Sequence, residues 1–399
     1  MKILLTISSH LDPNSGAAGT TLRLGREYEK LGHEVRFYSF DNLPKRLPAA
    51  IRMVTFPEVA ASHVFNLVRQ QAIDVVDAPT GDGWLWAKWL KQSNKQLPLI
   101  VTRSHGLENT LHLDYLKEAT KGNLKLSWKY FLYRGSWRLW EETTALKNAD
   151  LVFLLNREDA NFAVKQLQVN RDRIHVVANG IPDSFIGLPF EPLPAASNAP
   201  LHIAQIGTYI ERKGIRYTVP ALNSILQRYS HVHVSFLGTG CPETQVYEDF
   251  ASELRDRITV IPRYSLEELP TLLKDHQIKL FAPLSEAFGK VLVEAMSCGL
   301  APVTSAAAGP LEVVRDGHDA LVVPIGNAIA IEAALEQLIR DQTYLETIRR
   351  NAYATAQDYS WSNVANQRLC LYQAALTELH SQNIPETSKK SHSHKVSDH

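Results

Sequence analysis

Short apolar runs alternate with helix-like stretches along the whole chain. One segment with helical periodicity, Thr21–Leu31, is closed by Gly32 and predicts a helix. The runs around it are apolar at consecutive positions, as strands buried on both faces of a parallel sheet are. In the first half they are Ile3–Ser8, His33–Phe40, Asp74–Ala78, Pro98–Ser104, Leu151–Asn156 and Ile174–Ala178. This alternation predicts a doubly wound α/β domain over residues 1–185.

The pattern breaks at 183–200, which is rich in Pro, Ala and Ser and predicts a linker. It then restarts as a second parallel sheet with a helix at Val291–Ser297. The strands predicted for this sheet are His202–Ile206, His233–Leu237, Ile258–Ile261, Lys279–Ala282 and Ala301–Thr304. We therefore expect a second domain at 200–360. Ligands of open α/β sheets bind at the carboxyl ends of the strands, so the site is expected in a cleft between the domains.

The end of the chain is mainly helical from 328 to 379. We expect its last helix, at about 361–379, to pack back on the first domain. The polar tail at 381–399 is poor in aromatic residues and is predicted to be disordered.

Composition narrows the class of protein. Lys and Arg together number 42, as do Asp and Glu, so overall charge does not favour a nucleic-acid partner. Three distant cysteines, Cys241, Cys298 and Cys370, offer no zinc spacing and fit a reducing cytosol. The start, MKILLTISSH, is too short an apolar run for a secretory signal, and no run approaches the ~20 apolar residues of a membrane span. We expect a cytoplasmic protein.

The densest group of candidate residues lies in 281–327. Glu286 follows a predicted strand, and Glu294 comes eight residues later on a helix, about 12 Å further along its axis. Gly289 lets the backbone approach a ligand, and the helix start beside it offers free N–H groups to a diphosphate. The two carboxylates could then contact different parts of one ligand.

This run resembles the donor-site signature of the family-4 (group 1) retaining glycosyltransferases, which have the GT-B architecture of two Rossmann-like domains. The match includes the Glu286–Glu294 spacing, Phe288–Gly289 and the downstream Gly309–Glu312 segment. The resemblance implies a catalytic role for Glu286 on the sugar. It implies donor binding by Ala287, Phe288, Gly289, Lys290, Val291 and Glu294.

A second motif, Gly207–Gly214, follows a predicted strand and opens a helix. The family has Gly-Arg here and then Lys-Gly, two cations that neutralise the leaving diphosphate. Lys213 matches, but Thr208 occupies the position of the Arg. Arg212 stands beside Lys213, and we expect it to supply the missing cation. Cations at a helix start oppose the helix dipole, so an anionic ligand explains them better than a solvated surface does.

The first domain carries two weaker signals. Gly16 and Gly19 lie in the loop after the first strand, 10–20, which resembles the family's glycine-rich loop facing the donor phosphate. It is not the GxGxxG fingerprint, which disfavours a nicotinamide site. His105 ends another strand, where the family often places a histidine near the reacting carbon. Asn179–Gly180 is assigned to the hinge.

The segment 117–138 contains six basic residues and one acid, with aromatic residues interleaved. Two interpretations stay open: a helical segment that contacts an anionic membrane, or a helix with a buried aromatic face. The basic residues are Lys117, Lys121, Lys125, Lys129, Arg134 and Arg138; the aromatic ones are Trp128, Tyr130, Phe131, Tyr133 and Trp137.

The resemblance implies transfer of a hexose-type sugar, with retention, from a UDP- or GDP-linked donor to a glycan, lipid or small-molecule acceptor. Polysaccharide biosynthesis is the expected setting. Lys213 and Arg212 would do the electrostatic work of a metal, so no metal or other cofactor is expected. Two alternatives stay open: a catalytically weak nucleotide-sugar-binding protein, and an epimerase or phosphorylase on the same fold.

Overall fold

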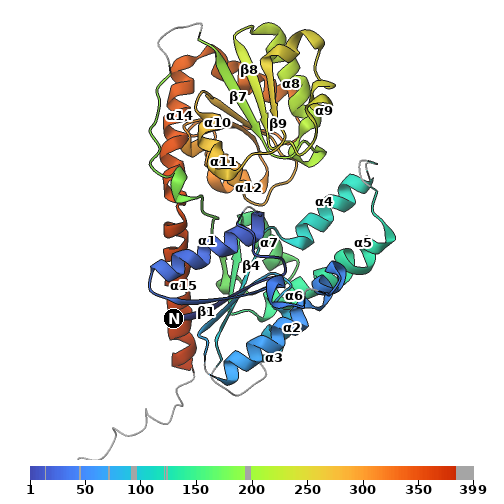
Figure 1. Ribbon diagram of the computed structural model, residues 1–399, viewed down its shortest axis with the longest axis vertical. Helices are drawn as coiled ribbons and strands as arrows, with labels where there is room; N and C mark the ends of the chain where they lie inside the picture. The colour runs from blue at the N-terminus through green and yellow to red at the C-terminus, as the bar shows by residue number, and fades with distance from the viewer. Residues whose placement is uncertain are drawn as a thin grey trace, which may run out of the picture.

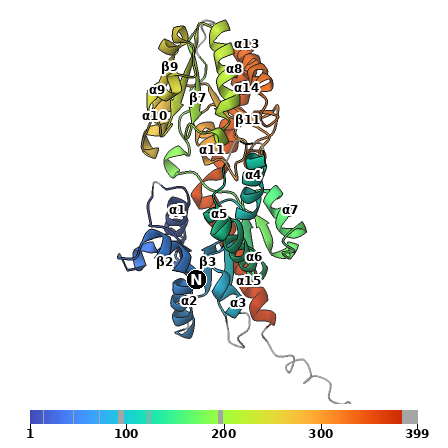
Figure 2. The same ribbon diagram turned by 90° about the vertical axis from the view of Figure 1, so that its right-hand side faces the viewer.

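The computed structural model describes residues 1–382, except positions 14, 45, 71, 91–96, 121, 123–124 and 194–198. Two domains lie one above the other (Figures 1 and 2). Helices α11 (Lys290–Ser297) and α12 (Ala308–Val313) of the upper domain face α1 (Gly16–Lys30) and α7 (Arg157–Lys165) of the lower one (Figure 1).

The N-terminal domain contains a six-stranded parallel sheet in the order β2-β1-β3-β4-β5-β6. Its strands are β1 (Lys2–Ile7), β2 (Glu34–Ser39), β3 (Val75–Pro79), β4 (Leu99–Arg103), β5 (Leu151–Leu154) and β6 (Ile174–Val176). Besides α1 and α7, its helices are α2 (Ala49–Arg69), α3 (Trp84–Leu90), α4 (Glu108–Thr120), α5 (Trp128–Leu132) and α6 (Arg138–Asn148). All six predicted strands are present, because central strands buried on both faces leave a clear apolar signal.

The C-terminal domain repeats this plan with a sheet in the order β12-β11-β10-β7-β8-β9, also parallel. Its strands are β7 (Leu201–Ile206), β8 (Val232–Leu237), β9 (Ile258–Ile261), β10 (Ile278–Phe281), β11 (Ala301–Ser305) and β12 (Leu321–Val323). Its other helices are α8 (Ile215–Arg228), α9 (Glu243–Tyr247), α10 (Leu269–Leu273), α13 (Ala328–Arg340) and α14 (Gln342–Ala356). Strand β12 was not predicted, because three residues on a sheet edge are too few for a recognisable pattern.

The last helix, α15 (Trp361–Gln382), returns to the N-terminal domain and runs along it in both views (Figures 1 and 2). Trp361, Leu369 and Tyr372 are buried against the sheet there, and the Tyr372 hydroxyl donates to Asp77 Oδ2 over 2.6 Å. The chain passes between the domains twice. The two crossings lie side by side, and Ile181 N–H in the first donates to the Tyr359 carbonyl in the second. Since α15 continues to Gln382, the predicted tail begins too early; its residues 383–399 lie outside the described part of the chain.

Two local predictions were wrong. Helix α1 begins at Gly16 and not near Thr21, because the Ser15 side chain caps it by accepting from Ala18 N–H. The segment 117–138 is not one helix: α4 ends at Thr120, and the chain resumes as α5, a π-helical turn (Tyr133–Trp137) and α6. Lys121 lies outside the described residues. Over the ranges that the structure describes, no helix combines the length and apolarity needed to cross a membrane.

Candidate functional site

Two loops of the C-terminal domain, 207–214 and 282–286, pack directly on each other. Gly214 is left-handed, with φ of 82°, and a Cβ atom there would collide with the Ala282 carbonyl oxygen. Leu284 N–H donates to the Arg212 carbonyl over 2.9 Å. Only glycine permits this approach, which brings the two motifs predicted from the sequence into one site.

The packing of these two loops brings the side chains of Lys213 and Arg212 next to the Glu286 carboxylate. Lys213 Nζ lies 2.6 Å from Glu286 Oε2, and Arg212 Nη1 lies 3.7 Å from the same oxygen. Arg212 Nη1 also donates to the Ser285 carbonyl over 3.2 Å. Arg212 and Lys213 therefore both face the same oxygen of the Glu286 carboxylate.

Helix α11 begins beside this pair. Its N-cap is Gly289, with φ of 91°, and no side chain caps the helix. A Cβ atom at Gly289 would lie 3.0 Å from the Phe281 ring, while Lys213 Nζ lies 5.4 Å from the centroid of that ring. The uncapped N–H groups and the positive end of the helix dipole thus lie close to the Lys213 ammonium, an arrangement that suits a diphosphate.

The second carboxylate lies deeper. Glu294, in the second turn of α11, is only 5% exposed, and this burial raises the pKa of its carboxyl group against the opposing charges of Lys290 and Arg23. Below it, Lys279 of β10 is wholly buried and its Nζ has no hydrogen-bond partner. Burial, assisted by the charge of Lys213, lowers the pKa of Lys279 well below its usual value, while Glu294 opposes this shift.

The N-terminal domain reaches this site through α1. Lys290 Nζ donates to the Gly16 carbonyl over 3.2 Å. A Cβ atom at Gly19 would lie 2.5 Å from the Pro13 carbonyl oxygen, so the first turn of α1 requires glycine there, whereas Gly16 has open space around it. The predicted glycine-rich loop is therefore largely the first turn of a helix that touches α11.

His105 lies beside the same junction, directly before Gly106. The pKa of its imidazole is lowered well below the usual value, first by burial and then by Arg103, Arg368 and Lys290. Its Nε2 is out of contact with solvent and has no hydrogen-bond partner. A Cβ atom at Gly106, whose φ is 125°, would lie 3.2 Å from Ala287 Cβ. A neutral imidazole is thus held next to the loop that carries Glu286.

Sequence reasoning missed Arg23. This residue of α1 acts electrostatically on both Lys290 and Glu294 across the cleft. It stands seven residues after Gly16 and four after Gly19, so all three share one face of the helix. The signal was present in the sequence, but it can be read only when α1 is started at Gly16.

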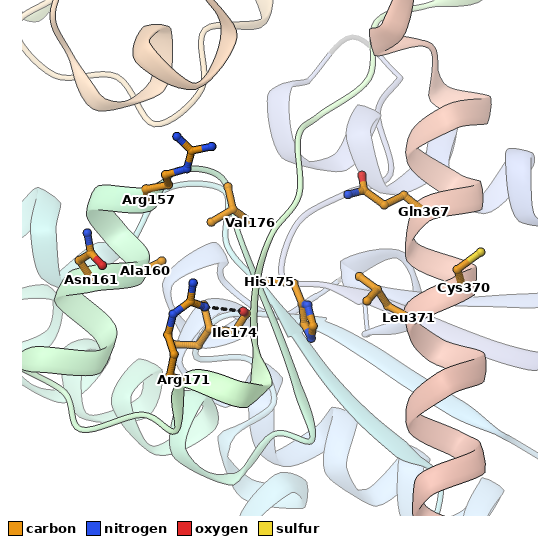
Figure 3. Close-up of a pocket in the computed structure, with 10 residues that line it drawn as sticks. All are labelled: Arg157, Ala160, Asn161, Arg171, Ile174, His175, Val176, Gln367, Cys370 and Leu371. Atoms are coloured by element: carbon orange, nitrogen blue, oxygen red, sulfur yellow. Dashed lines mark hydrogen bonds between the residues drawn. The ribbon is translucent and has the colours of Figure 1, made fainter.

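A cavity of about 780 Å³ lies elsewhere, between α7, β6 and α15 (Figure 3). Arg171, His175 and Leu371 are among its lining residues, and none of the predicted donor residues is. It is therefore separate from the site built on Glu286. In the ranges described here, no three His, Cys, Asp or Glu side chains are grouped as metal ligands.

Large apolar side chains are exposed on neighbouring elements of the N-terminal domain. Trp128 is 69% and Leu132 65% exposed, and Trp137 and Trp140 pack on each other with ring centroids 5.0 Å apart. Arg138 is instead enclosed by ion pairs with Asp82 and Glu141. The exposed large apolar side chains of this domain include Trp89, Leu113, Trp128, Phe131, Leu132, Trp137 and Trp140.

Comparison with known proteins decides the family. The sequence pattern described as "Glycosyl transferases group 1" matches residues 194–355, and the pattern described as "Glycosyltransferase Family 4" matches residues 14–185. The chain belongs to the group 1 glycosyltransferases. The two matches divide it at the predicted linker and cover both halves of the site described above.

Named relatives of this glycosyltransferase are distant. A D-inositol 3-phosphate glycosyltransferase of Mycobacteroides abscessus is 27% identical over 255 residues, 62% of this chain and 56% of the relative. An α-D-kanosaminyltransferase of Streptomyces kanamyceticus is 23% identical over 242 residues, 58% of this chain and 62% of the relative. The chain spans about half the length of the curated relatives that it matches.

Solved structures establish the GT-B fold of this glycosyltransferase. Sucrose-phosphate synthase from Thermosynechococcus elongatus superposes with a TM-score of 0.72 at 19% identity, over 94% of this chain and 99% of that one. WaaG, a glycosyltransferase involved in lipopolysaccharide biosynthesis, superposes with a TM-score of 0.65 at 15% identity, over 93% of this chain and 99% of that one. Anabaena HepE in complex with UDP-glucose superposes with a TM-score of 0.64 at 16% identity, over 94% of this chain and 100% of that one.

Proposed function

We propose that this glycosyltransferase moves a hexose-type sugar from a UDP- or GDP-linked donor, with retention at the anomeric carbon. The observation that carries the proposal is the contact of Lys213 with Glu286 beside the uncapped start of α11. Lys213 and Arg212 bind the diphosphate, and Glu286 accepts hydrogen bonds from sugar hydroxyls. Glu294 holds the ribose, as the family resemblance implies.

The chemistry proposed is a front-face displacement. The bond from the anomeric carbon to the leaving phosphate oxygen breaks, and the bond to the acceptor oxygen forms on the same face of the sugar. The acceptor proton passes to the leaving phosphate oxygen. Lys213 and Arg212 stabilise the charge that grows on the diphosphate, so the reaction needs no metal. We assign to His105 a hydrogen bond to the sugar near the reacting carbon, as the family resemblance implies.

The donor is tested by thermal shift with a panel of UDP-, GDP- and ADP-sugars. One nucleotide class is expected to raise the melting temperature, because a ligand that binds only the folded protein stabilises it. Slow hydrolysis of that nucleotide sugar is then monitored by NMR. The spectra identify which anomer of the sugar is released first. Release of the inverted anomer would exclude retention, and binding without any turnover would favour a binding protein. Turnover that survives EDTA is expected; its loss would contradict the metal-free mechanism.

We also propose that the acceptor is a lipid or a lipid-linked glycan, met at an anionic membrane. Trp128 and Leu132 point away from the core, and the exposed basic residues Lys117, Lys125, Lys129 and Arg134 lie near them in the sequence. Each cation close to acidic lipid contributes about 1 kcal/mol of attraction, and salt weakens it. This is the outward arrangement of aromatic residues that the membrane interpretation of 117–138 requires.

Cosedimentation with vesicles tests the membrane contact. Binding is expected with acidic lipid only, falling as salt rises. Trp128→Ser with Leu132→Ser should abolish it, whereas Trp86→Phe, a change in the buried core, should not. A protein that stays in the supernatant with acidic vesicles at low salt would contradict the proposal.

A further inference from the structure

The loop that carries Glu286 is held from both domains. Within its own domain, the Glu286 carbonyl accepts from Gly309 N–H over 2.8 Å. From the other domain, Asn156 Nδ2 donates to the Ala287 carbonyl over 3.0 Å. Two consecutive carbonyl groups are thus fixed by partners on opposite sides of the cleft, so the orientation of this loop depends on the domains staying together.

Asn156 has a second task at the start of α7. Its Oδ1 accepts from Asp159 N–H over 2.7 Å, which makes Asn156 the N-cap of this helix. Its Nδ2 donates to Asp159 Oδ2 over 3.0 Å as well as to Ala287. The side chain is 1% exposed, and both amide hydrogens have acceptors. The carboxamide is therefore held rigidly, with one N–H directed at the other domain.

Asp159 connects this contact to helix α4 of the N-terminal domain. Its Oδ1 accepts from Thr110 Oγ1 over 2.8 Å, and Thr110 lies in the first turn of α4. The N-terminus of α4 is also held by Glu142, which accepts from Glu108 and Asn109. A continuous chain of hydrogen bonds therefore joins α4 to the loop beside Glu286.

We propose that Asn156 is a positioning residue that clasps the two domains and sets the loop 286–288 for donor binding. The proposal rests on the proposed function, because it assumes that this loop holds the donor. A neighbouring contact supports it: Arg157 N–H donates to Glu312 Oε1 over 2.7 Å, so the start of α7 touches the C-terminal domain at two consecutive residues. The Arg157 side chain is 81% exposed, and its Nε forms only a 3.7 Å ion pair with Glu312 Oε2.

The two tasks of Asn156 can be separated by substitution. Asp and Ser are both good N-caps, so both variants keep α7 capped. Asn156→Ser should therefore retain a melting temperature close to that of wild type, whereas Asn156→Asp also brings a buried carboxylate next to Asp159 and should lower it. Neither supplies the N–H to Ala287. Aspartate places a carboxylate against the Ala287 carbonyl and Asp159, so it repels them, whereas serine only loses the contact. Asn161→Asp, the same change at an exposed position on α7, is the matched control.

The first measurement needs no ligand. Spin labels are placed on Arg69→Cys and Arg340→Cys, exposed positions in different domains, after the native cysteines are replaced by Ala. Distances in wild type and Asn161→Asp are expected to share one short population. Asn156→Ser should lose part of it, and Asn156→Asp most of it, to longer distances. The wild-type distribution in Asn156→Asp would overturn the proposal.

The second measurement is donor kinetics with the nucleotide sugar found by the thermal-shift panel. Losing one hydrogen bond that exists only in the closed form should raise KM about tenfold in Asn156→Ser, with kcat at saturation nearly unchanged. A purely structural role would instead lower the melting temperature and leave KM alone. If wild type binds no nucleotide sugar but Asn156→Asp still shows longer distances between the domains, the role of Asn156 in holding the domains together is supported and the proposed function fails. If the donor binds but the KM of Asn156→Ser is that of wild type, the positioning role fails alone.

Discussion

Lys213 Nζ lies 2.6 Å from Glu286 Oε2, and the two residues are 73 positions apart in the chain. Both side chains are under 20% exposed, at 17% and 18%. A charged hydrogen bond of this kind holds the lysine over the Phe281 ring, beside the first turn of α11. When a diphosphate arrives, the ammonium can be shared with it, so the free protein already keeps its cation in place.

Replacing this carboxylate should separate activity from stability. Glu286→Gln keeps the shape of the side chain but weakens both its hold on Lys213 and its hydrogen bonds to sugar hydroxyls. We expect turnover to fall by orders of magnitude, about 10²-fold or more, while the melting temperature changes little. Initial rates and a thermal melt of the same preparation measure this. Near-normal turnover would remove Glu286 from the mechanism.

Arg212 is expected to replace the cation that Thr208 does not provide. Arg212→Ala should weaken binding of the nucleoside diphosphate about tenfold, the loss of roughly one charge-assisted contact. Adding Thr208→Arg should partly restore it, because the side chain then returns to the family position. Isothermal titration with UDP and GDP measures both variants. An unchanged dissociation constant in Arg212→Ala would leave Lys213 as the principal cation.

All strands except β12 could be predicted, because apolar side chains follow one another in them. The start of α1 could have been predicted too, since Ser15 is a good N-cap; the glycines at 16 and 19 were interpreted as a loop instead. Arg23 was then missed, because its face depends on that start. Contacts such as Lys290 with Gly16 could not be predicted. They depend on how the two domains meet, and no local pattern of residues records this.

Acid should destabilise the C-terminal domain through His276. This ring is 8% exposed, bonded to Ser235 through Nε2, and its Nδ1 has no partner. Burial, assisted by His202, lowers the pKa of His276 to about 4. The unfolded chain binds the proton near pH 6.5, so the stability is present above that pH and is lost as pH falls toward 4. The loss is roughly 3 kcal/mol, from 1.36 kcal/mol per unit of pKa.

His276→Gln tests this assignment, because glutamine can still bond Ser235 but does not titrate. Urea unfolding of variant and wild type is compared between pH 7 and pH 4. The variant should lose less stability over this interval. The comparison with wild type is needed because burial raises the pKa of Glu142, in the other domain, to about 7. The raised pKa of Glu142 stabilises the folded protein at low pH, and this contribution is lost as pH rises. It therefore changes with pH in the direction opposite to the His276 contribution. Equal slopes in both proteins would show that His276 does not carry the effect.

The return helix should contribute measurably to the N-terminal domain. Tyr372→Phe removes the hydroxyl that donates to the buried Asp77, which also forms ion pairs with Arg103 and Arg368. A hydrogen bond to a charged group contributes about 1.5–3 kcal/mol, so the free energy of unfolding should fall by this amount. Tyr28→Phe is the control: it loses only a 3.2 Å bond between two hydroxyls and should cost about 1 kcal/mol. Equal losses in both variants would show that Asp77 does not depend on Tyr372.

The return of α15 also sets the order in which the chain can fold during synthesis. The N-terminal domain is made first, but its sheet lacks Trp361, Leu369 and Tyr372 until α15, the last helix described, has left the ribosome. The C-terminal domain, whose strands and helices all lie between Leu201 and Ala356, is complete earlier. Domains usually fold in the order in which they emerge. Here the second domain can finish before the first, because a chain truncated after residue 360 would contain every strand and helix of the C-terminal domain but none of α15.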